Sequence, residues 1–168
     1  MAGSLEFIKS ATVSSVSSVS VTDCFSDKYD VYKIIFHSFE KQTSADNLGL
    51  RLIDSGGSII SDSEYDRALL QLQPDQAFTE VRHTNQTSLF SVIYQSVNSV
   101  GAGSTIYLFN PYDSSSYTFY INQSNSFDGK MVGRKHIGVH KVAEQTSGFN
   151  FFVSNGTFSM DISVYGVK

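Results

Sequence analysis

The segment from Phe158 to Tyr165 alternates apolar and polar side chains, and this pattern constrains the fold more than any other feature of the chain. Successive side chains of a β-strand point to opposite faces, so such alternation predicts a strand with one buried face and one solvated face. We expect the apolar side chains in a hydrophobic core; they are Phe158, Met160, Ile162 and Val164.

Other segments also have the length of strands and are rich in β-branched and aromatic residues. They are 31–39, 105–109, 117–121 and 149–153. Their more apolar faces add four side chains to the predicted core, namely Ile34, Phe36, Phe119 and Ile121. Glycine pairs and Asn-Gly, which favour tight turns, follow two of the apolar segments at 54–58 and 155–156.

Two further segments, 64–72 and 87–97, fit a helix about as well as a strand, and we favour strands for both. The valines of the serine-rich segment 10–20 predict two short strands that meet at a bend near Ser17. No linker or repeat divides the 168 residues, which suffice for one domain. The sequence therefore predicts one all-β domain over 1–168, an antiparallel two-sheet sandwich of jelly-roll type with about ten strands.

Charge and hydropathy exclude several classes of function. The net charge of −4 argues against electrostatic binding to nucleic acid. No apolar run approaches the roughly 18–20 residues of a membrane span, so we expect no membrane insertion. The chain begins without a basic and then apolar segment, so no secretory signal is expected.

The histidines, the cysteine and the carboxylates offer no catalytic or metal-binding spacing. On a strand, His136 and His140 would lie about 13 Å apart, too far to share one ion, and we expect both to face solvent. Cys24 has no nucleophile signature and is expected to be a buried thiol. We therefore predict neither cofactor nor metal, with a loop calcium site at Asp62 and Asp66, or at Asp23 and Asp27, as the alternative to ordinary turn formation.

Tyrosines and amide side chains gather in the second half of the chain. Aromatic rings next to amides are typical both of protein interfaces and of sandwiches that bind sugars, although ordinary sheet faces also carry them. The candidate contact residues are Tyr107, Tyr112, Tyr117, Tyr120, Asn110 and Asn122. The first 22 residues carry only two charged side chains, so this segment is poorly protected as a free edge. It should pair within the sandwich or add to a neighbouring subunit.

Several segments together resemble a known group of proteins. They are 5–26, 27–34, Leu50–Gly57, Leu108–Tyr112 and the terminal Val164-Tyr-Gly-Val-Lys168. The chain is similar, over nearly its whole length, to the small virion structural proteins of marine tailed phages, cyanophages in particular. That resemblance implies a strand-rich sandwich without catalytic residues, assembled in the host cytoplasm and located on a capsid, a tail fibre or a baseplate.

We therefore expect a non-enzymatic virion protein that decorates the capsid through contacts with other virion proteins, and that forms a homo-oligomer. The alternative is a tail-fibre or tail-tip module that binds host surface glycans. A small glycan-cleaving enzyme is a third hypothesis, but such enzymes need two carboxylates across a groove and the sequence singles out no such pair.

Overall fold

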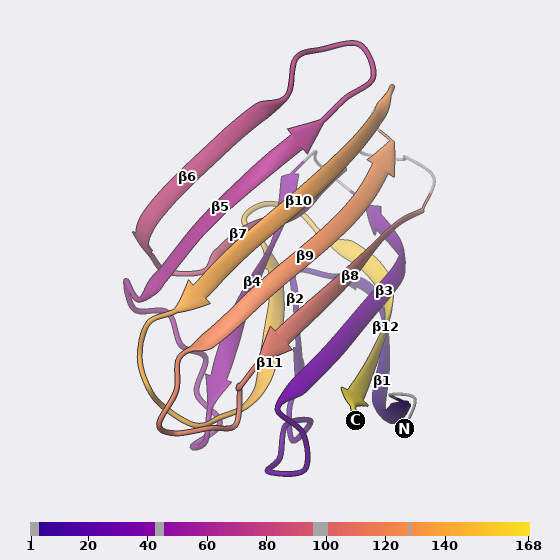
Figure 1. Ribbon diagram of the computed structural model, residues 1–168. Coiled ribbons are helices and arrows are strands. Elements are labelled where there is room, and N and C mark those ends of the chain that lie inside the picture. The colour runs from indigo at the N-terminus through magenta and orange to yellow at the C-terminus, as the bar shows by residue number, and fades with distance from the viewer. Residues whose placement is uncertain (1–3, 43–45, 96–100, 128) are drawn as a thin grey trace.

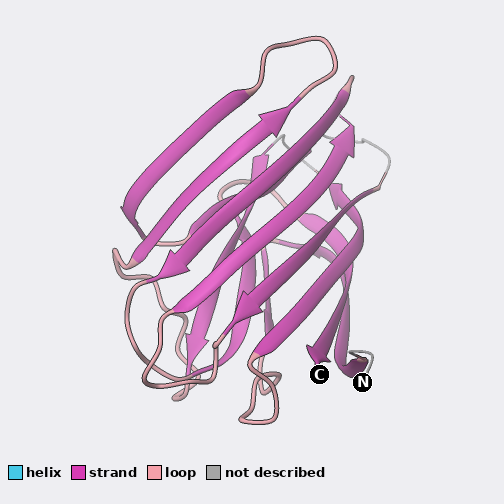
Figure 2. Ribbon diagram, viewed as in Figure 1, coloured by secondary structure: helices cyan, strands magenta, loops and turns pink. Residues whose placement is uncertain are grey.

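The computed structural model describes residues 4–42, 46–95, 101–127 and 129–168, and it consists of strands joined by turns and loops (Figure 2). The strands are β1 (Leu5–Val16), β2 (Ser18–Val21), β3 (Val31–Lys41), β4 (Asp46–Asp54), β5 (Tyr65–Leu72), β6 (Thr79–Gln86), β7 (Leu89–Gln95), β8 (Ala102–Phe109), β9 (Thr118–Phe127), β10 (Met131–His140), β11 (Thr146–Val153) and β12 (Phe158–Val167). Within those ranges, no helix is long and apolar enough to cross a membrane.

The strands form two antiparallel sheets packed face to face, with the larger sheet nearer the viewer in Figure 1. The larger sheet has eight strands in the order β1-β12-β3-β8-β9-β10-β5-β6, and the smaller has four in the order β2-β11-β4-β7. The two-sheet sandwich predicted from the sequence is confirmed, and so are the strand assignments of β5 and β7. Residues 96 and 97, at the end of the predicted segment 87–97, lie outside the described residues.

The chain changes sheets at the two breaks that the sequence marks. Ser17 separates β1 from β2, which belong to different sheets, so the predicted bend is confirmed. The turn at Asn155 and Gly156 carries the chain from β11 in the smaller sheet to β12 in the larger, with Gly156 at φ 76°. The strand β1 pairs with β12 within the sandwich. This confirms the first of the two expectations for the N-terminal segment.

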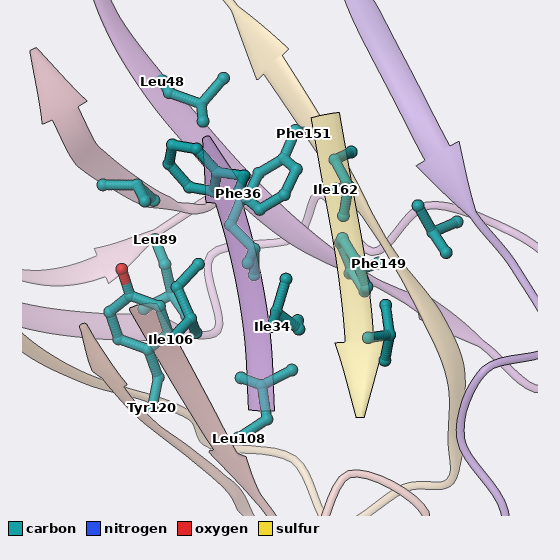
Figure 3. Packing of buried hydrophobic residues seen from close by; sticks show 14 of the residues in the cluster. Ile34, Phe36, Leu48, Leu89, Ile106, Leu108, Tyr120, Phe149, Phe151 and Ile162 are labelled. Carbon is teal, nitrogen blue, oxygen red and sulfur yellow. The ribbon is translucent and has the colours of Figure 1, made fainter. Parts of the chain in front are cut away.

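The core lies between the sheets and is built from aromatic and aliphatic side chains of both (Figure 3). The ring centroids of Phe36 in β3 and Phe151 in β11 are 5.4 Å apart, with the rings edge to face. Of the eight predicted core residues, six are buried, namely Ile34, Phe36, Phe158, Met160, Ile162 and Val164. Cys24 is buried as predicted, and burial raises the pKa of its thiol to about 12.

The prediction was wrong for β9, where Phe119 and Ile121 are 48% and 47% exposed. The opposite face of β9 is buried instead, although it carries Asn122 and Ser124. The reason lies in β7, whose pairing with β4 shifts register between Phe90 and Ile93. This irregularity leaves the Val92 carbonyl to accept hydrogen bonds from Asn122 Nδ2 (2.7 Å) and Ser124 Oγ (2.9 Å). Polar side chains with such partners can be buried at little cost.

Candidate binding face

The side of the larger sheet that points away from the smaller sheet is here called the outer face. Cross-strand pairing aligns its side chains in rows that run from β1 to β6, because paired residues lie on the same side of a sheet. The first row consists of Phe7, Tyr165, Lys33, Tyr107, Ile121, Ile137, Ala68 and Arg82, each paired with the next.

A second row lies beside the first and is more apolar. It consists of Leu5, Val167, Val31, Phe109, Phe119, Val139 and Asp66. Asp66, at its end, accepts a hydrogen bond from the Asn85 backbone N–H and pairs with Lys141 Nζ at 3.0 Å. These two contacts lower the pKa of its carboxyl. The charge therefore sits at the margin of the apolar area.

Large apolar side chains in both rows are open to solvent. The exposed fraction is 60% for Ile137 and 58% for Phe7, whose ring packs edge to face on Tyr165. Large exposed apolar side chains that lie next to one another, as Phe119, Ile121 and Ile137 do on paired strands, form a patch of the kind that marks interaction surfaces.

A hollow of about 530 Å³ lies where the two rows cross β8, β9, β10, β5 and β6. Its apolar wall is formed by Phe109, Phe119, Ile121, Ile137 and Val139. Arg82, whose guanidinium is 2.6 Å from Glu80 Oε1, lines the β6 side. The hollow is therefore an apolar depression with an ion pair at its rim.

A second hollow of about 610 Å³ adjoins the first and shares Ile121 with it. It is more polar, because Tyr107, Gln123 and Asn125 line it together with Ser104 and Thr105. Lys33 Nζ lies 5.7 Å from the centroid of the Tyr107 ring. An aromatic ring beside amides is an arrangement typical of sandwiches that bind sugars.

The structure separates the six candidate contact residues. Tyr107 lines the second hollow, and Tyr117 is 47% exposed in the loop before β9. Asn110 and Tyr112 line a third hollow of about 230 Å³ at the end of the sandwich. There Asn110, at φ 57°, donates from Nδ2 to Ser116 Oγ at 3.2 Å.

The other two candidates, Tyr120 and Asn122, are buried between the sheets, so their assignment as surface contacts was wrong. Asn122 accepts a hydrogen bond from Ser104 Oγ, besides donating to Val92.

Most residues of the outer face could not be predicted from the sequence. Ile137, Val139 and Phe109 carry no signal of their own, since a strand pattern does not say which face is covered by a second sheet. The expectation that His136 and His140 face solvent was also wrong, since both are on the buried side of β10. In the described residues, no group of three metal-ligating side chains lies on the outer face.

Comparisons with known proteins leave the fold without an assigned family. No family model matches the chain, and no curated protein matches it. A marine PL-14 alginate lyase from Aplysia kurodai is similar at a TM-score of 0.37 and 9% identity, over 95% of this chain and 81% of the lyase. The Caenorhabditis elegans galectin LEC-6 is similar at a TM-score of 0.30 and 9% identity, over 98% of this chain and 99% of the galectin. Such distant likenesses carry no argument about function.

Proposed function

We propose that this protein is a non-enzymatic binding module that docks on other proteins through the two apolar rows of its outer face. The observation that carries the proposal is the exposure of Phe119, Ile121 and Ile137 around one hollow. Interface cores are enriched in aromatic residues, as these rows are, and two of the three charged side chains of the rows, Asp66 and Arg82, lie at the β5–β6 end.

Aliphatic side chains favour a protein partner over a glycan. Ile121, Ile137 and Val139 offer no hydrogen bonds to the hydroxyl groups of a sugar, whereas they can be desolvated by the apolar side chains of another protein. The resemblance of the sequence to the virion structural proteins of tailed phages leads us to place the module on a phage particle. There it decorates the capsid, and its partners are other virion proteins and further copies of itself.

The docking face is tested by placing a charge in it. Ile137→Glu puts a carboxylate in the first row, at the wall of the first hollow, and Ile59→Glu makes the same change at a side chain that is 43% exposed in the turn after β4. Sedimentation velocity of both variants and the wild type measures self-association. We expect a wild-type oligomer that Ile137→Glu reduces to a monomer and Ile59→Glu leaves intact.

An oligomer unaffected by Ile137→Glu, or a wild type that stays monomeric at every concentration, would show that the protein does not self-associate through this face.

The location of the protein on a phage particle needs a separate test. Antibody labelling of purified phage particles in the electron microscope should mark the capsid, and particles without label would contradict this location.

The glycan-binding alternative rests on the second hollow, where Tyr107, Gln123 and Asn125 combine a ring with two amides. A glycan array separates the two functions, because a module that binds only proteins should bind nothing there. Binding that Tyr107→Ala abolishes would favour the alternative.

A further inference from the structure

Three metal-ligating side chains meet at the end of the sandwich, away from the outer face. His140 ends β10, Glu64 immediately precedes β5, and Glu144 lies in the loop between β10 and β11. His140 Nε2 is 3.1 Å from Glu64 Oε2 and 3.5 Å from Glu144 Oε1. One ligand atom from each residue lies within 4.8 Å of the other two.

These separations are those of ligands around a small divalent cation. Zinc binds histidine nitrogen and carboxylate oxygen at about 2.0–2.2 Å, so adjacent ligands of a tetrahedral site lie roughly 3.3 Å apart. The two distances from His140 Nε2 therefore fit without movement of the backbone. Three protein ligands would leave the fourth position of a tetrahedral site open. That position would be accessible from solvent, because the Glu64 and Glu144 side chains are about one-third exposed, at 32% and 33%.

The histidine is held in position before any ion arrives. Its side chain is fully buried, and the Tyr65 ring lies against the imidazole at 4.9 Å between centroids. The Lys141 backbone N–H donates to the Glu64 carbonyl at 2.9 Å, which fixes the end of β10 beside the start of β5 (Figure 1). A site supported by rigid neighbours loses little entropy on binding.

The cluster lacks positive charge to balance its carboxylates. In the described part of the chain, the ion pairs of Glu64 and Glu144 run only to His140. Nδ1 of the buried His140 imidazole also has no hydrogen-bond partner among those residues.

The surroundings add further negative charge. Asp54 and Asp62 also lie near enough to Glu144 to act on it electrostatically. Carboxylates crowded in this way are stabilised by a cation in their midst.

We propose that Glu64, His140 and Glu144 form a binding site for a divalent transition-metal ion of the zinc type. The mixed nitrogen and oxygen donors favour such an ion over calcium, whose protein ligands are oxygens. The ion would tie the loop after β10 to the start of β5, although 76 residues separate Glu64 from His140 in the sequence. The site is independent of the proposed docking face.

The test is a titration of untagged, EDTA-treated protein with zinc chloride by isothermal calorimetry. Glu144→Gln removes one ligand charge and keeps the size of the side chain, and Glu80→Gln, on exposed β6, is the matched control. We expect one zinc ion per wild-type chain, binding at least tenfold weaker to Glu144→Gln, and an unchanged affinity for Glu80→Gln. The wild-type melting temperature should also rise with zinc and not with an equal concentration of calcium.

Two results would overturn the proposal. If zinc neither binds the wild type nor raises its melting temperature, the cluster is an ion pair only. If Glu144→Gln and Glu80→Gln both bind zinc as the wild type does, the ion is held elsewhere, for example by the exposed His37 or His83. Far-ultraviolet circular dichroism of Glu144→Gln confirms that the variant is folded before its affinity is compared.

Discussion

Acid should destabilise this protein through one buried histidine. His136 is 1% exposed on the inner side of β10, its Nε2 has no partner among the described residues, and its Nδ1 is 3.5 Å from the Tyr120 hydroxyl. Burial is the largest cause that lowers its pKa, to about 3, and the positive charges of Arg67 and Arg134 lower it further. The native state therefore keeps this imidazole neutral at every pH above that value.

The sign and size of the effect follow from proton linkage. In the unfolded chain the same histidine has a pKa of about 6.5. Between pH 6.5 and pH 3 the imidazole is therefore protonated in the unfolded state and neutral in the native state. Stability then falls as the pH falls, by about 1.4 kcal/mol for each pH unit. Between pH 6.5 and pH 5 the loss amounts to about 2 kcal/mol, a large part of the 5–15 kcal/mol that is usual for a domain.

Urea unfolding at pH 7.5, 6 and 5, followed by circular dichroism because the chain has no tryptophan, measures this loss. In His136→Gln the side chain does not titrate, so the difference in stability between wild type and variant should shift by about 2 kcal/mol from pH 7.5 to pH 5. His83→Gln, at an exposed position of β6, is the control that should follow the wild type. Parallel curves for His136→Gln and the wild type would refute the reasoning, because the imidazole would then titrate alike in both states.

Two further changes test the packing between the sheets. Ile162→Ala, at a side chain that is 1% exposed in the middle of β12, should cost about 2–5 kcal/mol, and an unchanged melting temperature would show that the inner face of β12 is misassigned. Arg67→Met should raise the free energy of unfolding by about 1–3 kcal/mol, because the guanidinium is largely buried with Nε and Nη1 unpartnered among the described residues. A lower urea midpoint for Arg67→Met would mean that water or an anion satisfies those donors.

The fold was readable from the sequence where one face of a strand is much more apolar than the other. In β12, Met160 and Ile162 alternate with Asp161 and Ser163, and the buried face was predicted correctly. In β9 the residues Phe119 and Ile121 suggested the wrong face. The hydrogen-bond acceptor that allows Asn122 to be buried is a carbonyl 30 residues away, in β7. No local pattern reports such a partner.

The candidate sites were harder to predict than the fold, because they depend on register. Ile121, Ile137 and Ala68 are neighbours on the outer face only because β9, β10 and β5 pair in one particular alignment. Glu64 and His140 meet for the same reason, although 76 residues separate them. Of the predicted contact residues, Tyr107 lines the second hollow. Buried and partly exposed side chains alternate along β8, and Tyr107 is on the outer side of that strand.

The pairing of β1 with β12 has a consequence for the order in which the protein can fold during synthesis. Thr12 Oγ1 donates to Asp161 Oδ1 at 2.6 Å, across 149 residues of sequence, and β2 pairs with β11. β1 and β2 are therefore synthesised well before their partners β12 and β11, and until then their backbone groups are unpaired. During that interval β1 and β2 are open strands with few charges, which is the state most prone to join other chains. We infer that slow or interrupted translation of this protein leads to aggregation through its N-terminal segment.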